Sequence, residues 1–116
     1  MLSVEAILYY KDRPVEFVTD IIKATPDDNQ ADILNRVANN RMTSIRSGHG
    51  IGKSTALSWL IIWFMCTRPF PKIPCTAPTK HQLYDILWAE IAKWLNPTLR
   101  TEIEWTQEKL YMKRYP

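Results

Sequence analysis

The spacing of apolar and polar positions predicts four helices along this chain. Pro14 suits the first turn of one helix, and Thr25 can cap the next with Pro26 at its first helical position. The segment Thr79-Lys80-His81-Gln82 has the pattern of a capping box, and Asn96-Pro97 ends the helix that this box begins. The segments with an apolar face at helical spacing are 12–22, 25–40, 55–66 and 79–95.

Two short segments rich in β-branched or apolar residues, 41–46 and 72–77, are predicted to be strands. A β-hairpin turning near Gln107-Glu108 is expected over residues 101–115, where apolar and polar residues alternate. A strand, a loop, a helix and a second strand in this order form a right-handed βαβ unit. The fold class predicted from the pattern is therefore α/β with parallel strands.

The segment 55–66 has the apolar character of a helix that is buried on several sides. Its strongly apolar run from Ala56 to Cys66 has eleven residues, which is too short to cross a bilayer. Trp59 and Trp63 lie four residues apart on one face of this helix. We expect them to pack in the core rather than to serve as stacking platforms for bases.

All three glycines of the chain lie in one loop, ahead of the helix predicted over 55–66. Glycine tolerates positive φ, so successive N–H groups can converge on an anion, and the N-terminus of the following helix adds to this field. Lys53 supplies a mobile positive charge for phosphates, and the hydroxyl of Ser54 suits Mg²⁺. This pattern favours a phosphate-binding loop over a plain glycine-rich turn with a solvated lysine. The predicted binding residues are Ser47, Gly48, His49, Gly50, Ile51, Gly52, Lys53, Ser54 and Thr55.

Gln30 has two interpretations. It lies in the first turn of the helix predicted over 25–40, just before the apolar face begins. Spacing alone favours a solvated helix glutamine. Its amide offers both a donor and an acceptor, however, which is what the edge of an adenine base requires.

Three motifs together resemble the ATPase half of the large terminase subunit, the motor that packages DNA into the heads of tailed bacteriophages. They are Pro26–Gln30, Arg46–Ser54 and Ala77–Gln82, and the resemblance covers residues 14 to about 95. It implies that Gln30 contacts adenine, that the loop and Lys53 hold the phosphates of ATP, that Lys53 is catalytic, and that Ser54 binds Mg²⁺. The segment that begins at Ala77 is similar to motif Ia of helicases.

The chain departs from the family pattern in three ways. Ser47 occupies a position where the phosphate-binding loop has glycine, and His49 stands where many large terminases have an arginine that acts on the γ-phosphate. The chain contains no Asp-Glu pair, whereas in the family an aspartate supports Mg²⁺ and a glutamate activates water. An arginine acting on the γ-phosphate would therefore have to be Arg46 or come from a neighbouring subunit, and we expect the chain alone to hydrolyse ATP weakly or not at all.

The resemblance implies a P-loop NTPase-like parallel sheet with flanking helices, here incomplete, as the N-terminal part of a longer terminase. Residues 1–24 would form an N-terminal helical segment, and residues 25–116 a partial P-loop ATPase domain. The implied function is ATP binding in a motor that translocates DNA into the prohead. The implied partners are double-stranded DNA, the portal protein, the small terminase subunit and further copies of the chain, in the cytoplasm of a bacterial host.

Two other functions fit the same residues. One is the N-terminal lobe of another P-loop motor, such as a helicase, in which the phosphate-binding loop would serve the same purpose. The other is a non-enzymatic interaction module, or a remnant that no longer binds nucleotide. Nucleotide binding would separate the non-enzymatic module or remnant from the terminase and from any other P-loop motor.

Composition adds few constraints. The hydrophobic content of 46% argues against disorder, and the net charge of +3 is compatible with nucleic acid without indicating it. Cys66 and Cys75 are expected to be buried thiols in a reducing compartment, since no metal-binding spacing is present. No signal peptide is indicated at the start, and His81 is expected on a helix surface. The lysines are expected to be scattered on the surface, although some could track DNA phosphates.

Overall fold

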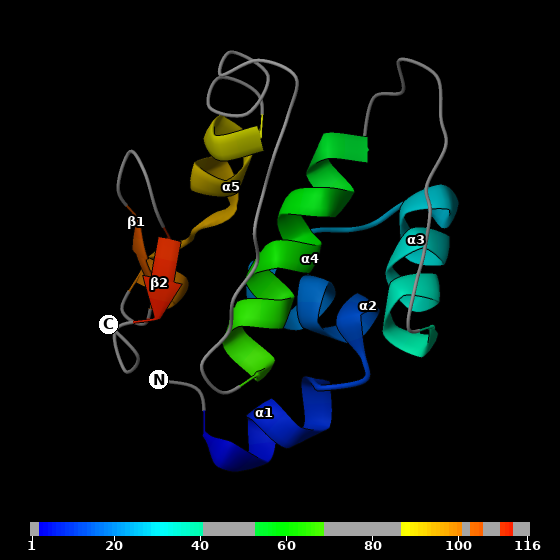
Figure 1. The fold of residues 1–116 in the computed structure, drawn as a ribbon, viewed down its shortest axis with the longest axis horizontal. Helices are drawn as coiled ribbons and strands as arrows, with labels where there is room; N and C mark the ends of the chain where they lie inside the picture. The colour runs from blue at the N-terminus through cyan, green and yellow to red at the C-terminus, as the bar shows by residue number, and fades with distance from the viewer. Residues whose placement is uncertain (1–2, 41–52, 69–86, 101–102, 106–109, 113–116) are drawn as a thin grey trace.

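The computed structural model describes residues 3–40, 53–68, 87–100, 103–105 and 110–112 (Figure 1). These residues form six α-helices, one π-helical turn and two strands. In chain order the elements are α1 (Val4–Tyr10), α2 (Pro14–Phe17), the π-helical turn η1 (Val18–Ile22), α3 (Asp28–Asn39), α4 (Lys53–Thr67), α5 (Ala89–Trp94), α6 (Pro97–Arg100), β1 (Ile103–Trp105) and β2 (Leu110–Met112).

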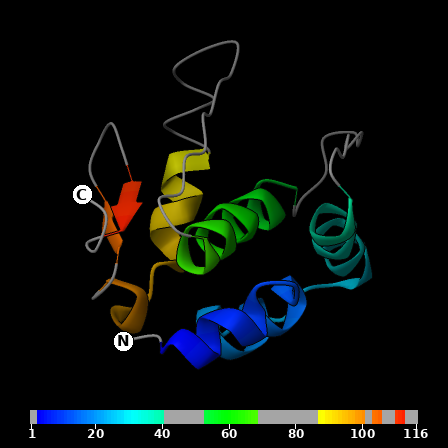
Figure 2. The same cartoon turned by 60° about the horizontal axis from the view of Figure 1, so that its bottom comes forward.

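Helix α4 is the element around which the others are packed. Helices α1, α2, α3 and α5, the turn η1 and strand β2 all contact it. In both views α3 lies on one side of α4, α5 and the hairpin lie on the other, and α1 and α2 lie beneath (Figures 1 and 2). This arrangement confirms that the apolar run is a helix buried on several sides. The helix is longer than predicted, since it begins at Lys53 and ends at Thr67.

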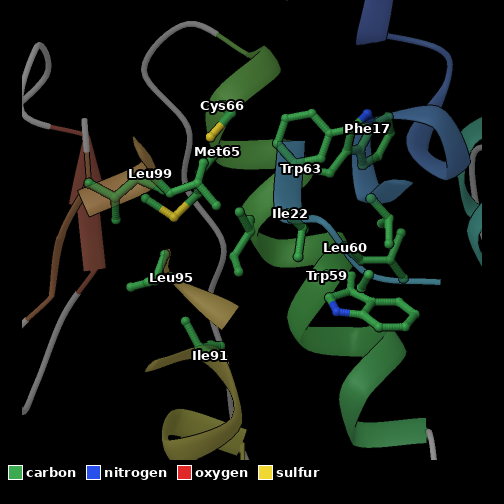
Figure 3. Packing of buried hydrophobic residues seen from close by; sticks show 14 of the residues in the cluster. Phe17, Ile22, Trp59, Leu60, Trp63, Met65, Cys66, Ile91, Leu95 and Leu99 are labelled. Atoms are coloured by element: carbon green, nitrogen blue, oxygen red, sulfur yellow. The ribbon is translucent and has the colours of Figure 1, made fainter. Parts of the chain in front are cut away.

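One hydrophobic core joins the N-terminal segment to the rest of the described chain. Phe17 and Trp63 are among its largest fully buried side chains, and they lie next to one another in Figure 3. Ile91, Leu95 and Leu99 line the other side of α4 (Figure 3). The prediction that Trp59 and Trp63 belong to the core is confirmed, because each is 2% exposed. Cys66 is a buried free thiol, as expected, and Cys75 lies outside the described residues.

The N-terminal segment is fixed by short-range signals. The Ser3 hydroxyl caps α1 by accepting the Ala6 N–H at 3.1 Å, and Pro14 occupies the first turn of α2 as predicted. The predicted helix over 12–22 continues only in part. It changes at Val18 to a π-helical turn, which ends at Ile22 and is followed by Lys23 with φ of 68°. The Ala24 N–H then donates back to the Val18 carbonyl at 3.1 Å, and this bond closes the turn.

The start of α3 differs from the prediction. We expected Thr25 to cap this helix, with Pro26 at its first position, but the cap is Asp27 and the helix begins at Asp28. The Asp27 carboxylate accepts the Gln30 backbone N–H at 2.8 Å, while the Gln30 side-chain oxygen accepts the Asp27 N–H at 3.0 Å. Both Thr25 and Asp27 are good capping residues. Only Asp27 has a glutamine three positions later that can return the bond, so the reciprocal pair determines where the helix starts.

The C-terminal elements include a short helix, α6, that the sequence pattern did not predict. Asn96-Pro97 ends α5 as expected and also begins α6, because the Asn96 side-chain oxygen accepts the Leu99 N–H at 2.9 Å. The antiparallel strands of the predicted hairpin are confirmed, since β1 pairs with β2 and Ile103 lies opposite Met112, whereas the turn predicted near Gln107-Glu108 lies outside the described residues. Both of these side chains are buried, so one face of the hairpin completes the core.

The predicted strands 41–46 and 72–77 lie outside the described residues, as does the capping box at 79–82. The α/β fold class with a parallel P-loop sheet therefore stays a prediction. The sheet found in the described residues is the two-stranded antiparallel hairpin. None of the helices in this part of the chain combines the length and the apolar character needed to cross a membrane.

Candidate nucleotide-binding site

The structure describes the C-terminal end of the predicted phosphate-binding loop. Lys53 is the first residue of α4, and Ser54 and Thr55 follow in its first turn. Both Ser54 and Thr55 are half-buried. The predicted binding residues from Ser47 to Gly52 lie outside the described residues. The first N–H groups of an α-helix have no partner inside the helix, so the first turn of α4 is suited to an anion in front of it.

The first turn of α4 is held by the packing of the rest of the helix. Below it, Ser58 is completely buried and its hydroxyl donates to the Thr55 carbonyl at 2.6 Å. The Trp63 ring N–H donates to the Tyr10 carbonyl at 2.7 Å, which ties the lower half of α4 to α1. Because these groups are fixed at several levels, the hydroxyls of the first turn have a defined position relative to the core.

The side chain of Thr55 is engaged by α5. Its hydroxyl donates to the Glu90 carboxylate with an oxygen-to-oxygen distance of 2.6 Å, in a partly buried setting. This length is typical of a hydrogen bond to an ionised carboxylate. One turn further along each helix, the rings of Trp59 and Trp94 meet edge to face with their centroids 5.4 Å apart. A polar contact at the site and an aromatic contact behind it therefore both join α4 to α5.

The ring N–H groups of these two tryptophans contribute nothing polar to that contact. Within the described part of the chain, the buried ring nitrogens of Trp59 and Trp94 have no hydrogen-bond partner. The contact between the rings is therefore one of apolar packing and edge-to-face attraction. The Thr55–Glu90 pair supplies a hydrogen bond between α4 and α5.

Gln30 lies on α3, which packs against α4. Its side-chain oxygen belongs to the capping box, so local helix chemistry accounts for its orientation. In Figure 1 α3, α4 and α5 all begin toward the upper side of the molecule, which brings the first turns of the three helices to the same end. Gln30, Ser54 and Glu90 belong to these first turns or lie within one residue of them. The adenine contact of Gln30 stays a prediction.

The oxygen atoms at this end are compatible with Mg²⁺. In phosphate-binding sites, Mg²⁺ keeps several waters and takes few protein ligands, which are oxygen atoms. Ser54 offers a half-buried hydroxyl, and the Glu90 carboxylate contacts the neighbouring residue. Such a site requires no dense cage, and the described residues hold no group of three or more His, Cys, Asp and Glu placed for a metal ion.

Glu90 is the functional candidate that the sequence did not reveal. It follows Trp88 and Ala89 on the polar side of a helix, where a glutamate is ordinarily a solvated surface residue. Its partner Thr55 is 35 positions away. No local spacing rule connects residues at that separation, so only the packing of α5 on α4 identifies the pair.

Comparison with models of known protein families, with curated proteins and with solved structures found no match to this chain.

Proposed function

We propose that this chain binds ATP as part of the motor that packages DNA in a tailed phage, in the manner of a large terminase subunit. The observation that carries the proposal is the start of α4. The Gly-Lys-Ser sequence runs directly into a helix whose first residue is Lys53 and whose body is the centre of the core. A phosphate-binding loop requires a helix at this point of the sequence.

In this proposal different residues bind the phosphates, the magnesium ion and the adenine base of ATP. The amides of the loop and the Lys53 ammonium neutralise the β- and γ-phosphates, and the amides at the start of α4 extend this positive field. The Ser54 hydroxyl would hold Mg²⁺, which neutralises phosphate charge when it is bound. The Gln30 amide would read the adenine edge. The partners proposed with this function are double-stranded DNA, the portal protein, the small terminase subunit and further copies of the chain, in the host cytoplasm.

A nucleotide titration tests this function directly. A fluorescent ATP analogue is titrated into the purified chain, its Lys53→Ala variant and a control variant, Lys11→Ala. Lys11 is exposed at the end of α1, and its contact with Arg68 uses only its backbone carbonyl. Loss of a charge-assisted bond to phosphate costs about 1.5–3 kcal/mol, so Lys53→Ala should weaken binding about ten- to a hundredfold.

The control should bind as the unmodified chain does. Equal affinities for the unmodified chain and Lys53→Ala would contradict the phosphate-binding assignment. A stably folded chain that binds no nucleotide at all would favour the non-enzymatic interaction module instead.

A further inference from the structure

The contact between Thr55 and Glu90 brings a carboxylate to the end of α4 where the proposed function places phosphates. Thr55 directly follows Ser54, and successive Cα atoms are only about 3.8 Å apart. The Thr55 hydroxyl holds one oxygen of Glu90 at 2.6 Å. The negative charge is therefore fixed beside Thr55, in the same helical turn as the predicted magnesium ligand Ser54.

A carboxylate at this place opposes the binding of a bare nucleotide. The N-terminus of a helix attracts anions, and a fixed negative charge beside it reduces that attraction for phosphate. The same charge attracts a divalent cation. A nucleotide that arrives with Mg²⁺ is therefore affected much less than one without it.

The contact also controls where this charge lies. Glu90 is in the first turn of α5, and the position of α5 on α4 is fixed by the edge-to-face pair Trp59–Trp94 and by the burial of Ile91. A glutamate side chain has three rotatable bonds and would otherwise turn toward water. The Thr55 hydroxyl thus selects the orientation in which the carboxylate faces α4.

We propose that the Glu90 carboxylate, held in place by the Thr55 hydroxyl, makes the nucleotide site of this chain selective for the magnesium complex over the free nucleotide. This inference rests on the proposed function. Glu90 itself need not touch the nucleotide. Its effect is to keep a negative charge beside Thr55 in the first turn of α4.

The test compares nucleotide affinity with and without the metal. A fluorescent ATP analogue is titrated into each variant, once with excess Mg²⁺ and once with a chelator. The quantity of interest is the ratio of dissociation constants, with the value measured in chelator divided by the value measured in Mg²⁺. A unit charge at roughly 8 Å changes affinity about threefold when water screens it and about thirtyfold at an effective dielectric near 20. Glu90→Gln should therefore strengthen binding of the free nucleotide and lower the ratio by about three- to thirtyfold.

A pair of variants at Thr55 provides the second line of the test. Thr55→Val removes the hydroxyl but leaves the charge, and it should lower the ratio in part, because the carboxylate is no longer held. Thr55→Ser keeps the hydroxyl and should keep the unmodified ratio. Glu5→Gln is the matched control. Glu5 is exposed in α1, and its substitution changes the net charge by the same amount as Glu90→Gln does.

The outcomes separate the inference from the proposed function. A Glu90→Gln ratio equal to that of the unmodified chain, or equal changes in both conditions, would overturn the inference while Lys53→Ala still weakens binding. If Glu90→Gln does not fold by circular dichroism, equal ratios for Thr55→Val and Thr55→Ser overturn it instead. If Lys53→Ala leaves the titration unchanged, the proposed function fails and the inference fails with it.

Discussion

Asn96 links the two halves of the described chain, and its removal should have a large and separable effect on stability. Its side-chain nitrogen donates to the Ile21 carbonyl at 2.8 Å, across 75 positions of sequence. Its side-chain oxygen accepts the Leu99 N–H at 2.9 Å and so caps α6. Both contacts are partly buried. One side chain therefore fixes the start of a helix and also ties it to η1.

The two bonds can be valued separately. A helix cap of this kind contributes about 1 kcal/mol. Loss of the bond to Ile21 leaves a partly buried carbonyl without that donor, which costs about 1–3 kcal/mol. We expect Asn96→Ala to lower the free energy of unfolding by about 2–4 kcal/mol in total. For a chain of this length, that corresponds to a fall in melting temperature of about 8–16 °C.

Asn96→Ser distinguishes the two contributions. Serine caps helices well but is too short to reach the Ile21 carbonyl as asparagine does, so this variant should lose about 1–3 kcal/mol and keep the cap. Asn35→Ala is the control: Asn35 is exposed on α3, and its replacement should change stability by no more than about 0.5 kcal/mol.

Urea unfolding followed by circular dichroism gives all three values. If Asn96→Ala is no less stable than Asn35→Ala, the reasoning is wrong. If Asn96→Ser matches the unmodified chain, the bond to Ile21 contributes nothing measurable.

Two further predictions concern single positions. Lys23 has a left-handed backbone with φ of 68°, a conformation that costs a residue with a Cβ about 1–2 kcal/mol, so Lys23→Gly should raise the free energy of unfolding by about 0.5–1 kcal/mol. Lys23→Ala, which keeps the Cβ, should show no such gain in the same urea titration, and a loss of stability in Lys23→Gly would contradict the argument. Gln30→Glu keeps the oxygen that completes the capping box but removes the amide donor, so melting should be unchanged while the fluorescent ATP analogue binds about five- to tenfold more weakly. An unchanged affinity would leave the helix cap as the whole role of this side chain.

The helices were predictable wherever their apolar periodicity was strong, and their boundaries were not. Helix α4 was predicted because nearly every position from Ala56 to Cys66 is apolar. An apolar run of this length indicates a buried helix rather than a strand, since strands are usually shorter. The first residue of α3 was misplaced because Thr25 and Asp27 compete as caps, and the choice depends on the reciprocal bond from Gln30. The π-helical turn η1 gives no local signal. It is closed by the bond from Ala24 to Val18, while Val18 and Ile22 are buried in the core.

The candidate site could be proposed from the sequence only to the extent that its residues are local in the chain. Glycines, lysine and hydroxyl residues in fixed order indicate phosphate binding, because the loop requires those residues at those spacings. Gln30 was recognised as a candidate, although spacing alone favoured a solvated helix glutamine. The structure instead places its side chain in the capping box with Asp27. Glu90 could not be found in this way. Its relation to Thr55 arises from the packing of α5 on α4, which no short-range pattern encodes.

The position of α4 has a consequence for every experiment on the site. Its first turn carries Ser54 and Thr55, and its remaining turns contribute much of the core, including Trp59, Ile62 and Trp63. A substitution in those later turns lowers the folded fraction, and the apparent nucleotide affinity then falls in proportion, with or without Mg²⁺. A substitution that acts on the site itself changes the two conditions unequally. The ratio of the two dissociation constants therefore distinguishes a binding effect from a folding effect, which a single affinity measurement at this helix cannot do.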